Sequence, residues 1–312
     1  MTVRIGMHKL FPAFLILLLV SCSGCNNAIK PVNFLEGQDT HIPVLIASMM
    51  TSTSSGNLLF DEEIGEISAF AATPIALRGV SAGAKNVTLV FQEAIPAGTS
   101  VLVEGKVKDI RGNSNRFSLR MWGKNTNPAS VVINEFTTKG TEKQPDRVEL
   151  MVTRSGNLGG FVVTDGNDRC ILPDRMAWKG EYLVVQFQKG EQTLELRSEA
   201  LLGLASNNGV LYVLSNPASD GTFLDAVAYS SRTATFDGWG NETVRQQVQR
   251  LSESKSWLPE GSDQAVDSTY ATATRSFNRI AGPDTDGKND WYITTQGHAT
   301  FGSANWEAVY EP

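Results

Sequence analysis

The residues that most often carry covalent catalysis are few in this chain. A hydrolytic nucleophile usually needs a general base beside it, and histidine most often supplies that base. The chain has three histidines, His8, His41 and His298. The first two precede the region where strands are expected, so a Ser-His-Asp triad would have to use His298. An isolated histidine in a polar segment is ordinarily solvated, and histidine and cysteine are not clustered at zinc-ligand spacing, so the sequence favours neither kind of site.

Carboxylates are plentiful and offer two other kinds of chemistry. Asp284, Asp286 and Asp290 lie in a short loop with a glycine, and calcium prefers such oxygen ligands. The spacing differs from that of the twelve-residue calcium loop, so the alternative is a plain turn held by the aspartates. The densest acidic run, residues 61–63, is interpreted as a solvated loop or strand edge. Glycosidases need two carboxyl groups at a set separation, which a sequence does not locate. Calcium is therefore the one cofactor candidate.

Aromatic side chains offer binding surfaces in place of covalent chemistry. The chain has six tryptophans, and Trp291 is expected in a core because large aromatic side chains usually fill one. Trp239 differs, since Gly238 and Gly240 flank it. Glycines on both sides favour an exposed turn, where the indole face contacts a sugar or a partner protein. A packing role for Trp239 is the alternative, and the sequence leaves both open.

The N-terminus has the parts of an export signal. Arg4 and Lys9 form a positive region, and an apolar run follows that is too short to span a membrane. The tetrapeptide Leu-Val-Ser-Cys that ends at Cys22 resembles the bacterial lipobox, in which the cysteine receives lipid and becomes the mature N-terminus. Residues 1–21 are thus predicted to be a signal peptide, and Cys22 is the predicted lipidation site. Cys25 is the alternative site.

Several acyl chains on one cysteine would anchor the protein firmly to a bilayer, whereas one chain binds only marginally. In well-studied bacteria, an aspartate directly after the lipidated cysteine retains a lipoprotein in the inner membrane. The residues after the two candidate cysteines are Ser23 and Asn26. By this resemblance the outer membrane is favoured, with the protein periplasmic or surface-exposed. Residues 22–55 are polar overall and are predicted to be a lipidated tether, in which the apolar patch of residues 43–50 is an alternative first strand.

The remaining bulk properties exclude some partners and bonds. The formal net charge is −6 and becomes more negative when the basic signal leaves, which argues against binding of nucleic acid. Cys170 is the third cysteine, and no disulfide is expected between it and Cys25 in the tether. Stability must then come from burial of apolar side chains.

Period-two alternation after residue 55 predicts strands. Apolar side chains alternate with polar ones around Leu89, Leu119 and Leu150, and glycine-asparagine turns lie between the strands. The pattern predicts an all-β fold of two immunoglobulin-like β-sandwiches in tandem, at residues 56–127 and 128–308. One exception is the i, i+4, i+7 spacing of Val244, Val248 and Leu251 after Asn241. It predicts one short helix within an insertion at about residues 230–270.

A series of segments in the second region resembles the lamin tail domain, an immunoglobulin-like β-sandwich also found in bacterial surface and secreted proteins. The matching segments are residues 131–136, 146–150, 158–166, 180–185, 207–213, 224–229, 276–279, 290–291 and 301–305. Met151 and Val152 depart from the family pattern, and the insertion is longer than usual. Residues 76–123 more weakly resemble a small bacterial immunoglobulin-like domain.

These observations predict a membrane-anchored, non-catalytic lipoprotein that acts as a binding or scaffolding module of the bacterial cell envelope. Its expected partners are the lipid bilayer, through the acyl anchor, and an unidentified envelope protein or glycan. The alternative is a carboxylate-based hydrolase acting on polysaccharide or phosphate esters, because lamin tail domains often accompany such enzymes. Since a fold alone does not establish a function, the preference rests on the missing catalytic groups and the anchor.

Overall fold

The computed structural model describes residues 39–190, 195–218, 221–258, 261–306 and 308–312. One compact unit, His41–Pro312, contains every helix and strand described. Residues 1–21, Cys22 and Cys25 lie outside the described residues. Within the described part of the chain, no helix is long and apolar enough to cross a membrane.

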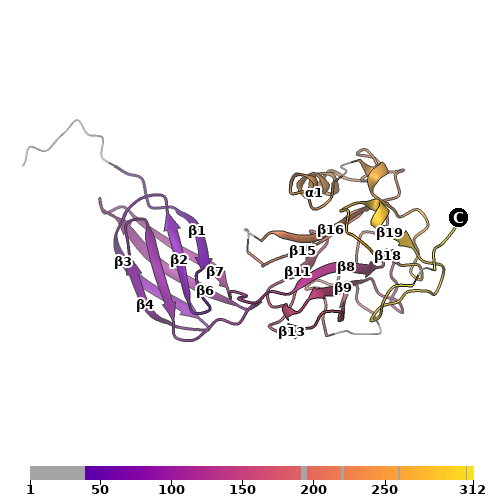
Figure 1. The fold of residues 1–312 in the computed structure, drawn as a ribbon. Helices are drawn as coiled ribbons and strands as arrows, with labels where there is room; N and C mark the ends of the chain where they lie inside the picture. Colours follow the sequence, from indigo (N-terminus) through magenta and orange to yellow (C-terminus); the bar gives the residue numbers. More distant parts are fainter. Residues whose placement is uncertain (1–38, 191–194, 219–220, 259–260, 307) are drawn as a thin grey trace, which may run out of the picture. The chain divides into compact units, whose positions relative to one another are not determined.

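A first β-sandwich is formed by two antiparallel sheets, with strand orders β1-β2-β5-β4 and β3-β6-β7 (Figure 1). Side chains from both sheets form one hydrophobic cluster, which includes Phe60, Leu89 and Val103. Its strands are β1 (Leu45–Met50), β2 (Ser55–Phe60), β3 (Ile64–Thr73), β4 (Leu77–Ala82), β5 (Asn86–Phe91), β6 (Ser100–Asp109) and β7 (Ser114–Trp122).

A second β-sandwich has two five-stranded sheets, with strand orders β12-β11-β15-β16-β17 and β14-β9-β8-β18-β19. Both sheets contribute to a second, larger cluster, in which Phe136 and Phe277 stack with ring centroids 4.5 Å apart. The short strands β10 and β13 pair with each other and form a separate two-stranded sheet. The bounds are β8 (Ser130–Phe136), β9 (Arg147–Arg154), β10 (Gly156–Asn157), β11 (Val162–Thr164), β12 (Arg169–Ile171), β13 (Met176–Ala177), β14 (Tyr182–Gln186), β15 (Gly209–Leu214), β16 (Phe223–Ser230), β17 (Val266–Asp267), β18 (Phe277–Arg279) and β19 (Trp291–Ile293).

The predicted helix is present as α1 (Glu242–Glu253), which contacts β15 and β16. The Asn241 side chain accepts a hydrogen bond from the backbone N–H of Val244 at 2.9 Å and so caps the helix start. Val244, Val248 and Leu251 face inward and are buried. The all-β fold with two sandwiches and a short helix in the insertion is therefore confirmed.

The start of the first sandwich differs from the expected tether of residues 22–55. Strand β1 begins at Leu45 and pairs antiparallel with β2, and Met50 belongs to the core. The apolar patch is thus the first strand, as the alternative predicted, and the first sandwich begins before residue 56.

Candidate functional site

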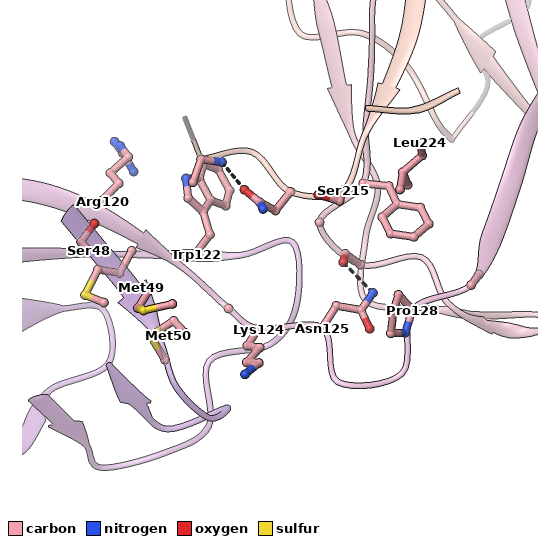
Figure 2. Close-up of a pocket in the computed structure, with 18 of the residues that line it drawn as sticks. Ser48, Met49, Met50, Arg120, Trp122, Lys124, Asn125, Pro128, Ser215 and Leu224 are labelled. Atoms are coloured by element: carbon pink, nitrogen blue, oxygen red, sulfur yellow. Dashed lines mark hydrogen bonds between the residues drawn. The ribbon is translucent and has the colours of Figure 1, made fainter. Parts of the chain in front are cut away.

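A pocket of about 500 Å³ lies within the unit His41–Pro312 (Figure 2). It is formed by the end of β1, the end of β7, residues 123–125 and 128–130 that follow β7, the turn at residues 159–161, and a group comprising Ser215, Asn216, Ala218 and Leu224. These segments are far apart in sequence and come together only in the folded chain. A cavity of this size is in the range that encloses small ligands.

The pocket walls are largely apolar. Met49, Met50 and Met121 lie on one part of the lining, and the rings of Trp122 and Phe161 add flat surfaces. Met121 is buried, whereas Met49 is 60% exposed. Methionine side chains are unbranched and polarizable, so this lining adapts to the shape of an apolar ligand.

The charged side chains of the lining are all basic. Arg120, Lys124 and Arg154 line the pocket, and no Asp or Glu is among the described lining residues. The chain as a whole has 33 acidic and 27 basic residues, so the pocket reverses the overall balance. Lys124 Nζ donates to the backbone oxygen of Thr51 at 3.1 Å, and Arg154 Nη2 donates to that of Pro128 at 2.9 Å. These bonds hold cations at the pocket, where they favour an anionic group.

Polar contacts hold the segment after β7 in place. The Asn125 side-chain amide donates to the backbone oxygens of Asn157 at 2.9 Å and Gly159 at 3.0 Å. Backbone packing is also close, because a Cβ added to Gly159 would lie 2.7 Å from the Cβ of Ala97. The pocket is therefore bounded by segments that are fixed to one another by direct contacts.

Two buried glutamates lie elsewhere, on neighbouring strands. Glu135 on β8 is the cross-strand partner of Glu149 on β9, and both side chains are fully buried. Burial raises the pKa of Glu149 to about 7; hydrogen bonds from Asn134 and Gly302 oppose the rise, and the charge of Glu135 adds to it. Burial also raises the pKa of Glu135. Sequence analysis missed this pair, because Glu149 occupied a position expected to face solvent.

The hydrogen bonds of these glutamates tie down the C-terminal segment. Glu135 accepts from the backbone N–H of Thr300 at 2.9 Å and from its hydroxyl at 2.8 Å. Glu149 accepts from the backbone N–H of Gly302 and, at 2.8 Å, from the side chain of Asn134. Neither glutamate lines the pocket. The hydrogen bonds of the two glutamates therefore hold residues 300–302 against the sheet.

The calcium candidates do not gather as expected. Asp290 accepts from the backbone and hydroxyl of Thr285 and from the backbone of Gly287, so it serves as the cap of a short turn. Asp284 and Asp286 instead approach the buried Asp225, with carboxylate oxygens within 4.8 Å of one another. The plain-turn alternative accounts for Asp290, and the predicted set of three aspartates is wrong.

A cation is already present in this acidic group. Arg279 Nη2 lies 2.7 Å from Asp225 Oδ2, and its Nη1 lies 2.8 Å from Asp284 Oδ2. Arg279 is itself buried. Its guanidinium carbon lies over the Trp291 ring, 4.8 Å from the ring centroid. The guanidinium pairs with the buried Asp225 and with the exposed Asp284, so these three side chains form a partly buried ion-pair network.

Trp239 is buried, with 2% of its surface exposed, and belongs to the core of the second sandwich. The prediction of an exposed ligand contact is therefore wrong. The flanking Gly238 and Gly240 both have positive φ, +90° and +83°, and they turn the chain so that the indole points inward. Trp291 is also in the core, as predicted.

The remaining chemical candidates are structural. His41 Nε2 lies 2.7 Å from Asp61 Oδ2, which keeps the pKa of Asp61 below its usual value. His298 packs against Trp306 with ring centroids 5.4 Å apart. Residues 79–83 match the Gly-x-Ser-x-Gly pattern of hydrolases, which sequence analysis overlooked. Ser81 lies within strand β4 opposite Thr88 and not on a strand-to-helix turn, so the nucleophile geometry is absent there.

Comparisons with known proteins give one family and one relative. The profile of the TP_1001_2nd family, described as a protein second domain, matches residues 129–201 and 198–293, more than half of the chain. An uncharacterized protein of Treponema pallidum (strain Nichols) is 32% identical over 105 residues, which are 32% of this chain and 26% of that protein. The chain thus spans about a quarter of the length of this relative. The family match falls on the second sandwich.

Proposed function

The chain belongs to the TP_1001_2nd family, and we propose that it is a membrane-anchored, non-catalytic lipoprotein that acts as a binding module of the bacterial cell envelope. The observation that carries the binding role is the pocket at β1 and β7, which combines apolar walls with basic side chains. The lipobox-like segment ending at Cys22 supports the anchor. Ser23 in place of aspartate favours the outer membrane.

A non-catalytic role is supported by the state of the polar groups. The buried Glu135 and Glu149 are occupied by hydrogen bonds to the C-terminal segment. Asp225 is paired with Arg279. Groups that are bonded in this way hold the fold together.

We propose in addition that the second sandwich is a lamin-tail-like domain. The support is positional: the opening motif of the resemblance coincides with β8, and the segments at residues 207–213 and 224–229 coincide with the paired strands β15 and β16. The closing motif contributes Asn305 to the polar network at Asn134.

The anchor is tested by metabolic labelling with a palmitate analogue. Wild-type chain is expected to incorporate label, and Cys22→Ala to lose it, while Cys25→Ala keeps it. Label that persists in Cys22→Ala and is lost in Cys25→Ala moves the anchor to the second cysteine. Absence of label from the wild-type chain removes the anchor from the proposal.

The binding role is tested by recovery of partners from intact envelopes. Met49→Glu places a charge on the pocket wall, and Ile46→Glu places one on the same strand outside the pocket; both wild-type side chains are 60% exposed. Met49→Glu is expected to lose whatever wild type binds, and Ile46→Glu to keep it. If wild type and both variants recover the same set, the pocket has no part in binding.

The alternative, a carboxylate-based hydrolase, draws on one observation: two buried glutamates with raised pKa on adjacent strands. A general acid needs such a pKa. Screening of the full chain against polysaccharides and phosphate esters tests it. Turnover that disappears in Glu149→Gln would establish the enzyme and displace the binding proposal.

A further inference from the structure

We infer that the pocket binds a long-chain carboxylic acid, with the acyl chain against the methionine and aromatic walls and the carboxylate at the basic side chains. This inference rests on the proposed binding function and specifies its ligand. It is argued from charge, wall chemistry and size.

The pocket is basic, whereas the whole molecule is acidic. Arg120, Lys124 and Arg154 line the pocket without an acidic partner among the described lining residues. All three side chains are exposed, and hydrogen bonds to Ser100, Thr51 and Pro128 hold their charged ends. In a protein of net charge −6, a group of cations without carboxylates selects anions.

The apolar walls indicate that the anionic ligand also has an apolar part. Met49, Met121 and Phe161 supply an apolar lining that a free inorganic anion would leave uncovered. Burial of an alkyl chain against such a surface is favourable in proportion to the apolar area that is removed from water. An amphipathic anion satisfies both parts of the pocket, whereas phosphate or a neutral sterol satisfies only one.

The dimensions favour a single chain over a protein segment. The pocket has a volume of about 500 Å³ and is bounded by the turn at residues 159–161 on one side and the end of β1 on another. Cavities of this order enclose small molecules, whereas protein partners bury broader surfaces. A flexible methionine lining accommodates an alkyl chain without a fixed shape.

The experiment is a displacement titration on the full chain carrying Cys22→Ser and Cys25→Ser, so that its own acyl groups are absent. A fluorescent fatty acid is displaced by palmitate, by hexadecanol and by hexadecyltrimethylammonium, each below its solubility limit or critical micelle concentration. Palmitate is expected to displace the probe at a concentration about tenfold below that of hexadecanol, since it alone uses the cations. The cationic amphiphile is expected to be weaker still.

Matched variants locate the site. Arg120→Gln is expected to weaken palmitate about threefold to tenfold, while Arg116→Gln, on the same face of β7 but outside the pocket, is not. Met49→Glu is expected to abolish binding, and Ile46→Glu to preserve it. All four positions are exposed, so circular dichroism and melting should match the parent.

Three outcomes overturn the inference. Equal displacement by palmitate and hexadecanol shows that the basic side chains do not favour the carboxylate over a neutral head group. Palmitate binding that Met49→Glu leaves intact places the acid elsewhere on the molecule. Absence of palmitate binding, together with recovery of an envelope protein or glycan that Met49→Glu abolishes, rejects the acid and leaves the proposed binding function standing.

Discussion

The buried Glu149 makes stability depend on pH in an unusual direction. Its pKa is about 7 in the folded chain against an ordinary value of 4.5, and that of Asp146 is about 6 against 3.8 because burial raises it. A carboxyl whose folded pKa is raised contributes stability that is full below its unfolded pKa and is lost as pH rises through the folded pKa. The free energy of unfolding is therefore expected to fall from pH 5 to pH 8.

The size of the effect follows from the shift. One pKa unit is 1.36 kcal/mol, so the shift of Glu149 corresponds to about 3 kcal/mol at most. Replacing Glu149 by Gln imitates the protonated carboxyl and keeps an acceptor for the N–H of Gly302. The variant is expected to be more stable than wild type at pH 8 by up to about 3 kcal/mol and nearly equal to it at pH 5.

The assay is urea unfolding at pH 5, 6, 7 and 8, followed by tryptophan fluorescence. Trp239, Trp257 and Trp291 are all buried in the second core, so their signal reports the sandwich that contains Glu149. Glu104→Gln, at an exposed position on β6, is the control and is expected to leave the pH profile unchanged. A wild-type stability that is flat or rises from pH 5 to pH 8, or a Glu149→Gln variant with an unchanged slope, refutes the reasoning.

Three further predictions concern single sites. Asn241→Ala is expected to lower the free energy of unfolding by about 1 kcal/mol, because the backbone N–H of Val244 loses its cap; urea unfolding measures it, and no change would mean that water replaces the cap. Asp225→Ala is expected to cost about 3 to 5 kcal/mol, since it leaves the buried Arg279 without its nearest partner; a loss below 1 kcal/mol in the same assay would contradict a buried pair. The Cys170 thiol, whose pKa burial raises to about 12, is expected to react with iodoacetamide only after denaturation, and rapid labelling of folded protein would show that it is accessible.

The strands could be predicted from sequence wherever one face of a strand is buried. The alternation around Leu89 and Leu119 corresponds to the buried faces of β5 and to the inward side of β7. The helix also matched, because the spacing of its apolar residues and its cap are local signals. Such features depend on neighbours in sequence, which a single chain displays directly.

What the sequence missed depends on distant contacts. Alternation placed Glu149 on the solvent side of β9, but residues 300–302 cover that side and bury the carboxylate. Trp239 looked exposed because its flanking glycines suit any tight turn, and only the packing of the insertion decides which way the indole points. In the predicted calcium loop, Asp284 pairs with Arg279 of a preceding strand, and Asp290 caps a turn. Each of these outcomes is set by tertiary packing.

The pocket could not be predicted for the same reason. Its lining combines Met49, Arg120 and Leu224 from separate parts of the chain, and no single motif groups them. In sequence they are a methionine in an apolar patch, an outward arginine of a strand and a leucine beside a turn. Their shared chemistry becomes visible only when the fold places them around one cavity.

The central claim is that this pocket is occupied in the cell envelope. The most direct measurement is photo-crosslinking in intact cells from a photoreactive amino acid at position 49, with position 46 on the same strand as the control. We predict that the photoreactive residue at position 49 crosslinks to a ligand, and that the same residue at position 46 does not. Equal capture at both positions, or none at position 49, would contradict the account.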